Sequence, residues 1–231
     1  MDQRVKKNQL QPYFQVFRQL ADYYGDYQEL HRDSPTIAGK SVLDSLIATM
    51  LTQATTDRTA IRAFNALKER FPRWQLVMAS PDSEVEKEIA VAGLARQKTR
   101  HIRAMLEKVC ETFDDYTLEP LRQMDSLEAQ RMLLGLPGVG PKTAACVLAF
   151  ALERAAFPVD THVHRILQRL GWSDAKMTPI QVQSKMQKAV PAEIQSALHI
   201  YLIHHGRTLC RARTPNCTIC PIRESCKKLG V

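Results

Sequence analysis

Residues 143–150 are the most constraining stretch of the sequence, because they are apolar nearly all round. A helix with this pattern is stable only when all of its faces are buried. A turn with two glycines one residue apart, Gly138 and Gly140, comes before it. Pro141 follows the turn and suits the first residue of a helix. The chain must therefore build a core around this helix and mount the glycine turn at its N-terminal end.

The remainder of the chain predicts further helices. It has no sustained alternation of polar and β-branched residues, whereas helical spacing of apolar residues recurs from end to end. We therefore expect an all-α protein. Residues 25–40 are polar and turn-rich, so they are predicted to be a domain boundary or a long loop. Helices are expected near residues 8–24, 41–52, 58–71, 96–113, 178–190 and 192–206.

The charge of the chain favours a polyanionic partner. Lys and Arg number 32 against 24 Asp and Glu, which gives a formal charge of +8. Basic side chains that contact phosphates release condensed counterions, so nucleic acid is a natural partner, and a merely basic protein is the alternative. No apolar run approaches the roughly 18 residues of a membrane span. The N-terminal residues lack the apolar region of a signal peptide, so we expect a cytoplasmic protein that does not bind membranes.

Four of the six cysteines crowd into the end of the chain, with the spacing Cys210-x6-Cys217-x2-Cys220-x5-Cys226. Four thiolates this close in an intracellular protein indicate a metal site rather than disulfides. Chemistry alone leaves a four-cysteine zinc site and an iron–sulfur cluster open. Cys110 and Cys146 stand alone in apolar helical patterns, where buried free cysteine is common.

Lys142 and Asp160 are candidate reacting groups. Lys142 follows the glycine turn at the start of a helix, where the helix dipole and partial burial favour the neutral amine. A neutral amine forms Schiff bases with aldehydic sugars, although a lysine that contacts a phosphate is the simpler interpretation. Asp160 precedes another helix, so it is predicted to be an N-cap. A capping carboxylate stays ionised and can stabilise positive charge on a sugar as its base departs.

Two segments carry a family resemblance. LPGVGPKTA at residues 136–144 and FPVDTHVHR at residues 157–165 resemble the helix–hairpin–helix and aspartate signature of the endonuclease III family of DNA glycosylases. The resemblance extends to SLIATMLTQATTD at residues 45–57 and to the cysteine spacing. It implies two helical lobes with a DNA-binding cleft between them. The lobes would be a six-helix barrel domain at residues 34–154 and an iron–sulfur cluster domain formed by residues 1–33 and 155–231.

The resemblance also implies roles for single residues. The backbone amides of Gly138, Val139 and Gly140 would grip a DNA phosphate. Gln53 and Leu94 would enter the base stack when a nucleotide is extruded, beside a basic face formed by Arg96, Lys98 and Arg100. The loop that holds Arg211 and Arg213 would contact the DNA backbone. Cys210, Cys217, Cys220 and Cys226 would bind a [4Fe–4S] cluster.

The implied function is a bifunctional DNA glycosylase and AP lyase of base excision repair. Lys142 and Asp160 would be its catalytic residues, and oxidised pyrimidines its substrates. Lys142 would form a Schiff base, and β-elimination would then cleave the strand. The enzyme would act as a monomer, associated with the nucleoid, on double-stranded DNA with damaged or abasic sites. Two alternatives remain: a mismatch glycosylase that removes uracil or thymine opposite guanine, and a non-catalytic DNA-binding or redox-sensing paralogue.

Overall fold

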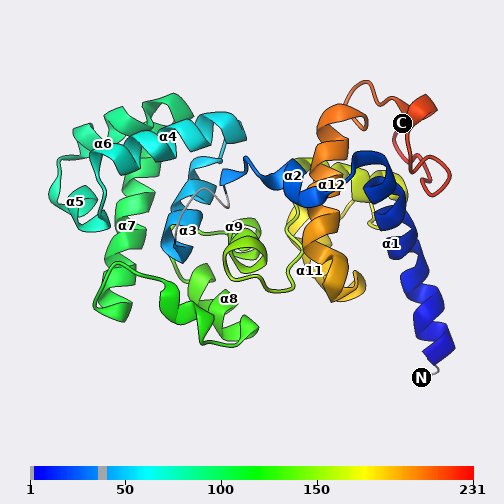
Figure 1. Ribbon diagram of the computed structural model, residues 1–231, viewed down its shortest axis with the longest axis horizontal. Coiled ribbons are helices and arrows are strands. Elements are labelled where there is room, and N and C mark those ends of the chain that lie inside the picture. The colour runs from blue at the N-terminus through cyan, green and yellow to red at the C-terminus, as the bar shows by residue number, and fades with distance from the viewer. Residues whose placement is uncertain (1–2, 36–40) are drawn as a thin grey trace. The chain divides into compact units, whose positions relative to one another are not determined.

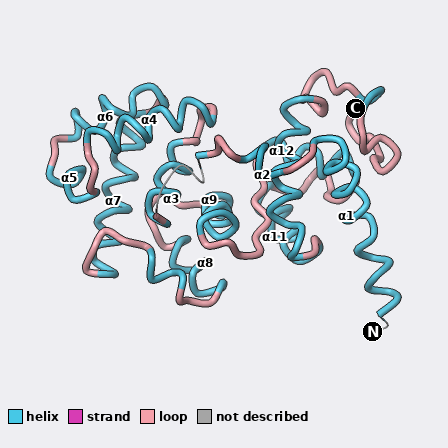
Figure 2. Tube along the Cα trace, viewed as in Figure 1, coloured by secondary structure: helices cyan, strands magenta, loops and turns pink. Residues whose placement is uncertain are grey.

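The structure is a computed structural model that describes residues 3–35 and 41–231, with the side chains of residues 10–35 and 41–231. Helices joined by loops make up this part of the chain, and no strand occurs in it (Figure 2). The all-α prediction is therefore confirmed. None of the described helices is both long and apolar enough to cross a membrane.

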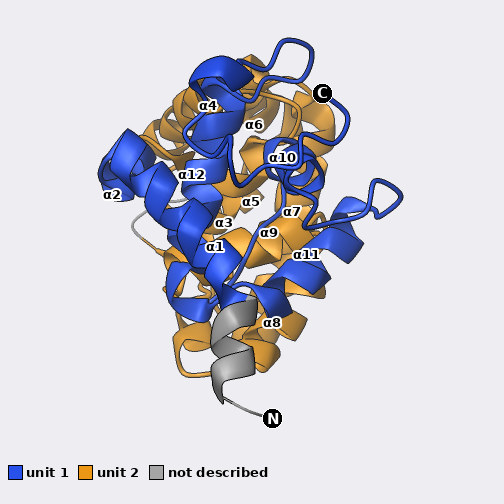
Figure 3. Cartoon of the chain, turned by 90° about the vertical axis from the view of Figure 1, so that its right-hand side faces the viewer, with its two compact units in different colours: residues 1–32, 155–231 blue, residues 33–154 orange. Residues whose placement is uncertain are grey.

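The chain divides into two compact units (Figure 3). The central unit is Asp33–Arg154, and the terminal unit combines Met1–Arg32 with Ala155–Val231. The first boundary lies one residue before the predicted one at residue 34, and the second lies at the predicted residue 155. Residues 36–40, which belong to the expected loop at 25–40, lie outside the described residues.

The central unit is a bundle of helices of different lengths (Figure 1). Its α-helices are α3 (Val42–Leu51), α4 (Asp57–Arg70), α5 (Trp74–Ala79), α6 (Asp82–Ile89), α7 (Ala95–Phe113), α8 (Ser126–Leu134) and α9 (Pro141–Cys146). Short 3-10 helices connect them at η2 (Ala90–Ala92) and η3 (Glu119–Arg122), and a π-helical turn, η4 (Val147–Ala151), follows α9. Helix α3 packs against α4, α7, α9 and η4, so it forms the centre of this unit.

Helix α3 is buried on every face, although its sequence pattern predicts one apolar face. Three of its four remaining positions are polar, and the side chains of Asp44 and Thr49 make hydrogen bonds inside the protein. Asp44 accepts from the Trp74 indole at 3.0 Å and pairs with the Lys68 ammonium at 3.3 Å. Thr49 donates to the carbonyl of Ser45 at 2.7 Å. Because paired polar groups can be buried at little cost, the whole helix serves as core.

The apolar stretch at residues 143–150 is helical as predicted, but its second half has an unexpected form. Residues 143–149 are buried. The α-helical pattern ends at Cys146 and continues as the π-turn η4, in which the Leu152 amide donates to the Val147 carbonyl at 3.0 Å. Such π-turns widen a helix locally, and they occur often at functional sites. The stretch therefore forms a rigid core element behind the glycine turn.

The terminal unit has a separate apolar core. Its helices are α1 (Gln3–Tyr24), α2 (Tyr27–His31), α10 (Thr161–Leu170), α11 (Pro179–Ala189) and α12 (Gln195–Thr208), with the short helices η5 (Ala192–Ile194) and η6 (Cys217–Ile219). The core joins residues such as Leu20, Val163, Leu167, Leu198 and Leu202. Helix α2 lies inside the predicted loop at 25–40. It forms because Asp26 caps it by accepting the Gln28 amide at 2.9 Å.

Candidate active site

Glycine occupies positions 138 and 140 of the turn for different structural reasons. Gly138 has a φ of +77°, and a Cβ placed on it would lie 3.0 Å from Cε of Met50 and 3.1 Å from Cβ of His101. Gly140 has a φ of −93°, and a Cβ there would meet no atom of the described residues within 4 Å, its chain neighbours aside. The fold therefore requires glycine at position 138 and leaves open space beside position 140. Open space next to backbone amides lets an anion approach closely.

The Val139 amide, which is expected to grip a phosphate together with those of Gly138 and Gly140, is instead used inside the turn. The Val139 amide donates to the Leu136 carbonyl at 3.2 Å, and the Val139 side chain is buried. Val139 therefore closes the turn and fixes its shape. Pro141 is the first residue of α9, as expected from its fixed φ and missing N–H. Lys142 is the second residue of that helix, and its side chain is partly exposed.

Asp160 is the N-cap of α10, as the sequence predicts. Its carboxylate Oδ1 accepts the Val163 amide at 2.7 Å, and its carbonyl accepts the His164 amide at 2.8 Å. The side chain is half-buried. Asp160 belongs to the terminal unit, whereas Lys142 belongs to the central unit.

Gln53 and Leu94 both follow a helix end in the central unit. Gln53 is exposed just after α3, and its Nε2 lies 3.5 Å from the Gly138 carbonyl, a long contact that joins its loop to the glycine turn. Leu94 precedes α7 with a left-handed backbone, φ 52° and ψ 34°, and its side chain is 57% exposed. A left-handed backbone is uncommon for a leucine, and residues with such strain cluster at functional sites.

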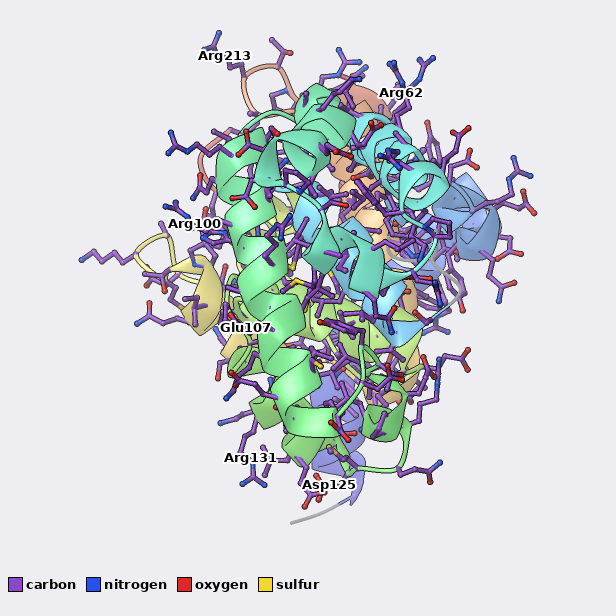
Figure 4. All side chains as sticks on the ribbon, turned by 90° about the vertical axis from the view of Figure 1, so that its left-hand side faces the viewer. Arg62, Arg100, Glu107, Asp125, Arg131 and Arg213 are labelled. Atoms are coloured by element: carbon purple, nitrogen blue, oxygen red, sulfur yellow. The ribbon has the colours of Figure 1, made fainter. Side chains whose placement is uncertain are left out.

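The basic face beside Leu94 is smaller than predicted. Arg96 and Arg100 are exposed, and Arg100 projects from the first half of α7 (Figure 4). With Leu94 they line a shallow depression of about 450 Å³. The expected position of Lys98 on this face is wrong, because its side chain is only 4% exposed.

Lys98 instead points into the core. Its ammonium donates to the carbonyls of Leu51 at 2.9 Å and Ala92 at 2.8 Å, and burial lowers the pKa of this lysine. The sequence does carry a signal for this orientation. Lys98 precedes Ile102, Met105 and Val109 by four, seven and eleven residues, so it continues their buried stripe.

The four clustered cysteines come together in the terminal unit. All four line one cavity, together with Arg169 and His205. Burial raises the pKa of the Cys220 thiol to about 11, and the other three cysteines raise it further through charge repulsion. Within the described residues, no group of three His, Cys, Asp or Glu side chains converges as the ligands of a single metal ion would. The repulsion acts on the thiolate forms, so negative charge on these four sulfurs needs a compensating positive group in the cavity.

Arg169 connects this cavity to the loop that holds Arg211 and Arg213. The sequence does not predict this role for Arg169. The side chain is 5% exposed. Its guanidinium contacts the sulfur of Cys210 at 3.2 Å and donates to the carbonyls of Arg211 at 2.8 Å and Ala212 at 2.9 Å. Arg211 and Arg213 are exposed on this loop, and Arg213 points away from the protein (Figure 4). The loop is thus held from inside and presents arginines outside.

His205 is a second unpredicted residue of the cavity. It is fully buried, with Nε2 3.5 Å from the sulfur of Cys220 and Nδ1 2.8 Å from the hydroxyl of Tyr24. Burial lowers the pKa of His205 to about 4, so the ring is neutral at pH 7. A neutral ring with one N–H can donate to a metal-bound thiolate, as in many metal sites.

Comparisons with known proteins agree with this arrangement. The model of the HhH-GPD superfamily of base excision DNA repair proteins matches residues 47–192. Endonuclease III of Bacillus subtilis is 33% identical over 183 residues, which cover 79% of this chain and 80% of that protein. A relative from Arabidopsis thaliana, named as a DNA glycosylase, is 36% identical over 73% of this chain. That match spans only 57% of the plant protein.

A solved structure extends the similarity to the whole fold. An endonuclease III trapped as a covalent intermediate with DNA matches with a TM-score of 0.76 and 28% identity, covering 94% of this chain and 96% of that one. The family model covers more than half of the chain, and the Bacillus relative exceeds 30% identity over most of it. The chain therefore belongs to the HhH-GPD superfamily of base excision DNA repair proteins and, within it, to the endonuclease III family of DNA glycosylases and AP lyases.

Proposed function

We propose that this protein is a bifunctional enzyme that removes oxidised pyrimidines from double-stranded DNA and then cleaves the strand, with Lys142 as its nucleophile. The observation that carries the proposal is the position of Lys142, the second residue of the helix that begins at the glycine turn. An amine mounted on a buried helix beside an anion-binding turn is held next to a gripped phosphate. The trapped covalent complex of the endonuclease III relative with DNA also supports it.

The proposed reaction has two stages. The amine of Lys142 attacks C1′ of the damaged nucleotide and loses a proton, while the base departs with the electron pair of the glycosidic bond. Opening of the sugar ring leaves an imine between Lys142 and C1′. Removal of a proton from C2′ then expels the 3′ phosphate by β-elimination, and water releases the lysine. The enzyme is regenerated without an oxidant or reductant.

Asp160 is proposed to stabilise the first stage. Positive charge develops on the sugar as the base leaves, and an ionised carboxylate lowers the energy of that state. Its Oδ1 is held by the Val163 amide, so the carboxylate has a fixed orientation. A preorganised charge needs no rearrangement during the reaction, which is the condition under which electrostatic stabilisation is strongest.

DNA binding is proposed to use the turn and the exposed arginines. The amides of Gly138 and Gly140 would hold a phosphate, while Val139 supports the turn through its bond to Leu136. Arg96, Arg100, Arg211 and Arg213 would neutralise neighbouring phosphates. Gln53 and Leu94 would fill the space that an extruded nucleotide leaves, because a base inside a duplex is out of reach of the lysine. We propose that the protein does this as a monomer.

The cysteine cavity is proposed to hold a [4Fe–4S] cluster through Cys210, Cys217, Cys220 and Cys226. The buried guanidinium of Arg169 supports this, because a buried charge requires a partner and four iron-bound thiolates provide negative charge. When bound, the cluster would supply a structural crosslink among the four cysteines. Arg169 and His205 would then donate to ligand sulfurs and position the loop of Arg211 and Arg213.

Borohydride trapping tests the proposed function. Wild-type protein and a duplex with an abasic site should give a covalent adduct, and Lys142→Ala should give none. Lys108→Ala, which removes an exposed lysine paired with Glu111, is the control and should trap normally. Absence of an adduct with folded wild-type protein would refute the lyase. A panel of oxidised pyrimidines, and of uracil or thymine opposite guanine, then separates the proposed substrates from the mismatch alternative.

A further inference from the structure

Lys98 is a buried cation whose ammonium joins two separate loops of the central unit. Its side chain is 4% exposed, and its Nζ donates to the carbonyl of Leu51 at 2.9 Å and to that of Ala92 at 2.8 Å. Leu51 is 47 residues away in the sequence, whereas Ala92 is six residues away. The ammonium is thus a bridge between the end of α3 and the start of α7.

Each of the two carbonyls lies two residues before a proposed stack-filling residue. Leu51 is the last residue of α3 and precedes Gln53. Its carbonyl belongs to the helix end, where backbone acceptors lack helical partners and a cation is favoured by the helix dipole. Ala92 is the last residue of η2 and precedes Leu94. One ammonium group therefore fixes the starting points of both loops.

Both loops contain strained backbone that needs external support. Ala54 has a φ of 57°, and Leu94 has a φ of 52°. The left-handed region is unfavourable for a residue with a Cβ, because the Cβ lies too close to the following carbonyl oxygen. Such residues persist only where their surroundings hold them. Lys98 holds the second loop twice, because its own amide also donates to the Leu94 carbonyl at 2.9 Å.

The local environment would accept an apolar side chain instead of a lysine. Lys98 continues the buried stripe of Ile102, Met105 and Val109, and burial lowers its pKa. Burial of a cation is unfavourable unless hydrogen bonds compensate, and here the ammonium donates to the carbonyls of the last residues of α3 and η2, where the two loops begin. A lysine at this position therefore serves to hold the two loops, whereas an apolar residue would serve only the packing of the core.

We propose that Lys98 is a positioning residue that sets the spacing between Gln53 and Leu94, so that both enter the DNA stack together. The inference rests on the proposed function, because it assumes that these two residues fill the space of an extruded nucleotide. Lys98 acts only through them and does not touch DNA.

A double-mutant cycle tests this role. Lys98→Met, which keeps an unbranched side chain as far as Cε but removes the ammonium, is made in the wild type and in the Gln53→Ala/Leu94→Ala background. Affinity is measured for a duplex with a tetrahydrofuran abasic-site analogue, with 2-aminopurine opposite it to report unstacking. In the wild-type background Lys98→Met should weaken binding about 10-fold and lower the fluorescence. In the double-mutant background it should change binding by less than about 2-fold, because coupled residues are non-additive.

Arg103→Met is the matched control. Arg103 lies on the same helix, donates to the carbonyls of Met78 and Ser80, and pairs with Asp82 at 2.7 Å. It therefore braces a different loop with the same kind of contact. Its removal should lower the melting temperature as Lys98→Met does, yet leave affinity and 2-aminopurine fluorescence unchanged. If Lys98→Met does not fold, Lys98→Gln retains a shorter donor and should show a smaller effect of the same kind.

Two results would overturn the inference. One is an equal loss of affinity from Lys98→Met in both backgrounds, and the other is an equal loss from Arg103→Met at matched stability. Either would make Lys98 a purely structural residue. A failure of the underlying proposal is recognised separately. If Gln53→Ala/Leu94→Ala alone leaves affinity and fluorescence unchanged, these two residues do not fill the stack. The proposed role of Lys98 is then refuted as well, because Lys98 acts only through them.

Discussion

The carboxylate of Asp160 accepts the backbone amide of Val163 at 2.7 Å, so the side chain proposed to act on the sugar also caps helix α10. The two roles place different demands on the side chain. Capping needs an oxygen that accepts an N–H, which an amide also provides. Stabilising a cationic sugar needs negative charge, which only the carboxylate provides.

Substitution of Asp160 therefore separates these roles. Asp160→Asn should retain the cap and change the free energy of unfolding by no more than a few tenths of a kcal/mol, because Asn and Asp are similar N-caps. Asp160→Ala should lose about 1 kcal/mol, which lowers the melting temperature by about 2–4 °C in a protein of this size. Both variants should bind abasic DNA and lose most base release in single-turnover assays. Base release by Asp160→Asn at the wild-type rate would show that the negative charge of Asp160 does not contribute to base release.

The glycine turn offers a second matched pair. Gly138→Ala should destabilise the fold by at least about 1–2 kcal/mol, because its φ is +77° and the new Cβ would press on Met50 and His101. Gly140→Ala should leave stability unchanged, or raise it by about 0.4–1 kcal/mol, since its φ suits alanine and the Cβ meets open space.

DNA binding tests whether a phosphate uses the open space beside Gly140. Gly140→Ala should weaken binding to a duplex although the protein is fully folded, because its Cβ occupies the space in front of the amides. Thermal unfolding and fluorescence anisotropy measure the two effects. Unchanged affinity of Gly140→Ala would show that a phosphate does not approach this turn.

Elements with local signals are predictable from the sequence. Helices expected at residues 41–52 and 58–71 are found at Val42–Leu51 and Asp57–Arg70. Their starts are fixed by the caps Ser41 and Thr56, which accept backbone amides three residues ahead. The form of the glycine turn and the cap at Asp160 also follow from neighbouring residues, so this part of the candidate site was accessible from sequence.

Features that depend on distant contacts were not predictable in the same way. The helical spacing of Lys98 matches the buried stripe of Ile102, Met105 and Val109, but its hydrogen-bond partners, the carbonyls of Leu51 and Ala92, carry no sequence signature. Arg169 lies 41 residues before the cysteine that it contacts, and only the fold brings them together. The π-turn after Cys146 depends on how the buried helix ends within the core.

Loss of bound iron should result only from substitution of the four clustered cysteines. Cys220→Ala should abolish bound iron and visible absorbance, because one ligand of four is removed. Trypsin should then cleave faster after Arg211 and Arg213, since the loop loses its crosslink. Cys110→Ser, which alters a cysteine of α7, is the control and should retain iron. If the wild-type protein is colourless and holds one zinc ion per chain, the site is a zinc site with the same four cysteines as ligands, and the proposed cluster is refuted.

Leu94 is expected to trade stability for function. Its left-handed backbone is unfavourable for leucine, and its side chain is 57% exposed, so the fold itself gains little from it. Leu94→Asn should leave the melting temperature unchanged or raise it, because asparagine tolerates this backbone best after glycine. Affinity for the abasic duplex and the 2-aminopurine signal should fall, since the apolar side chain no longer fills the stack. A lower melting temperature together with unchanged affinity would instead make Leu94 a structural residue of the turn before α7.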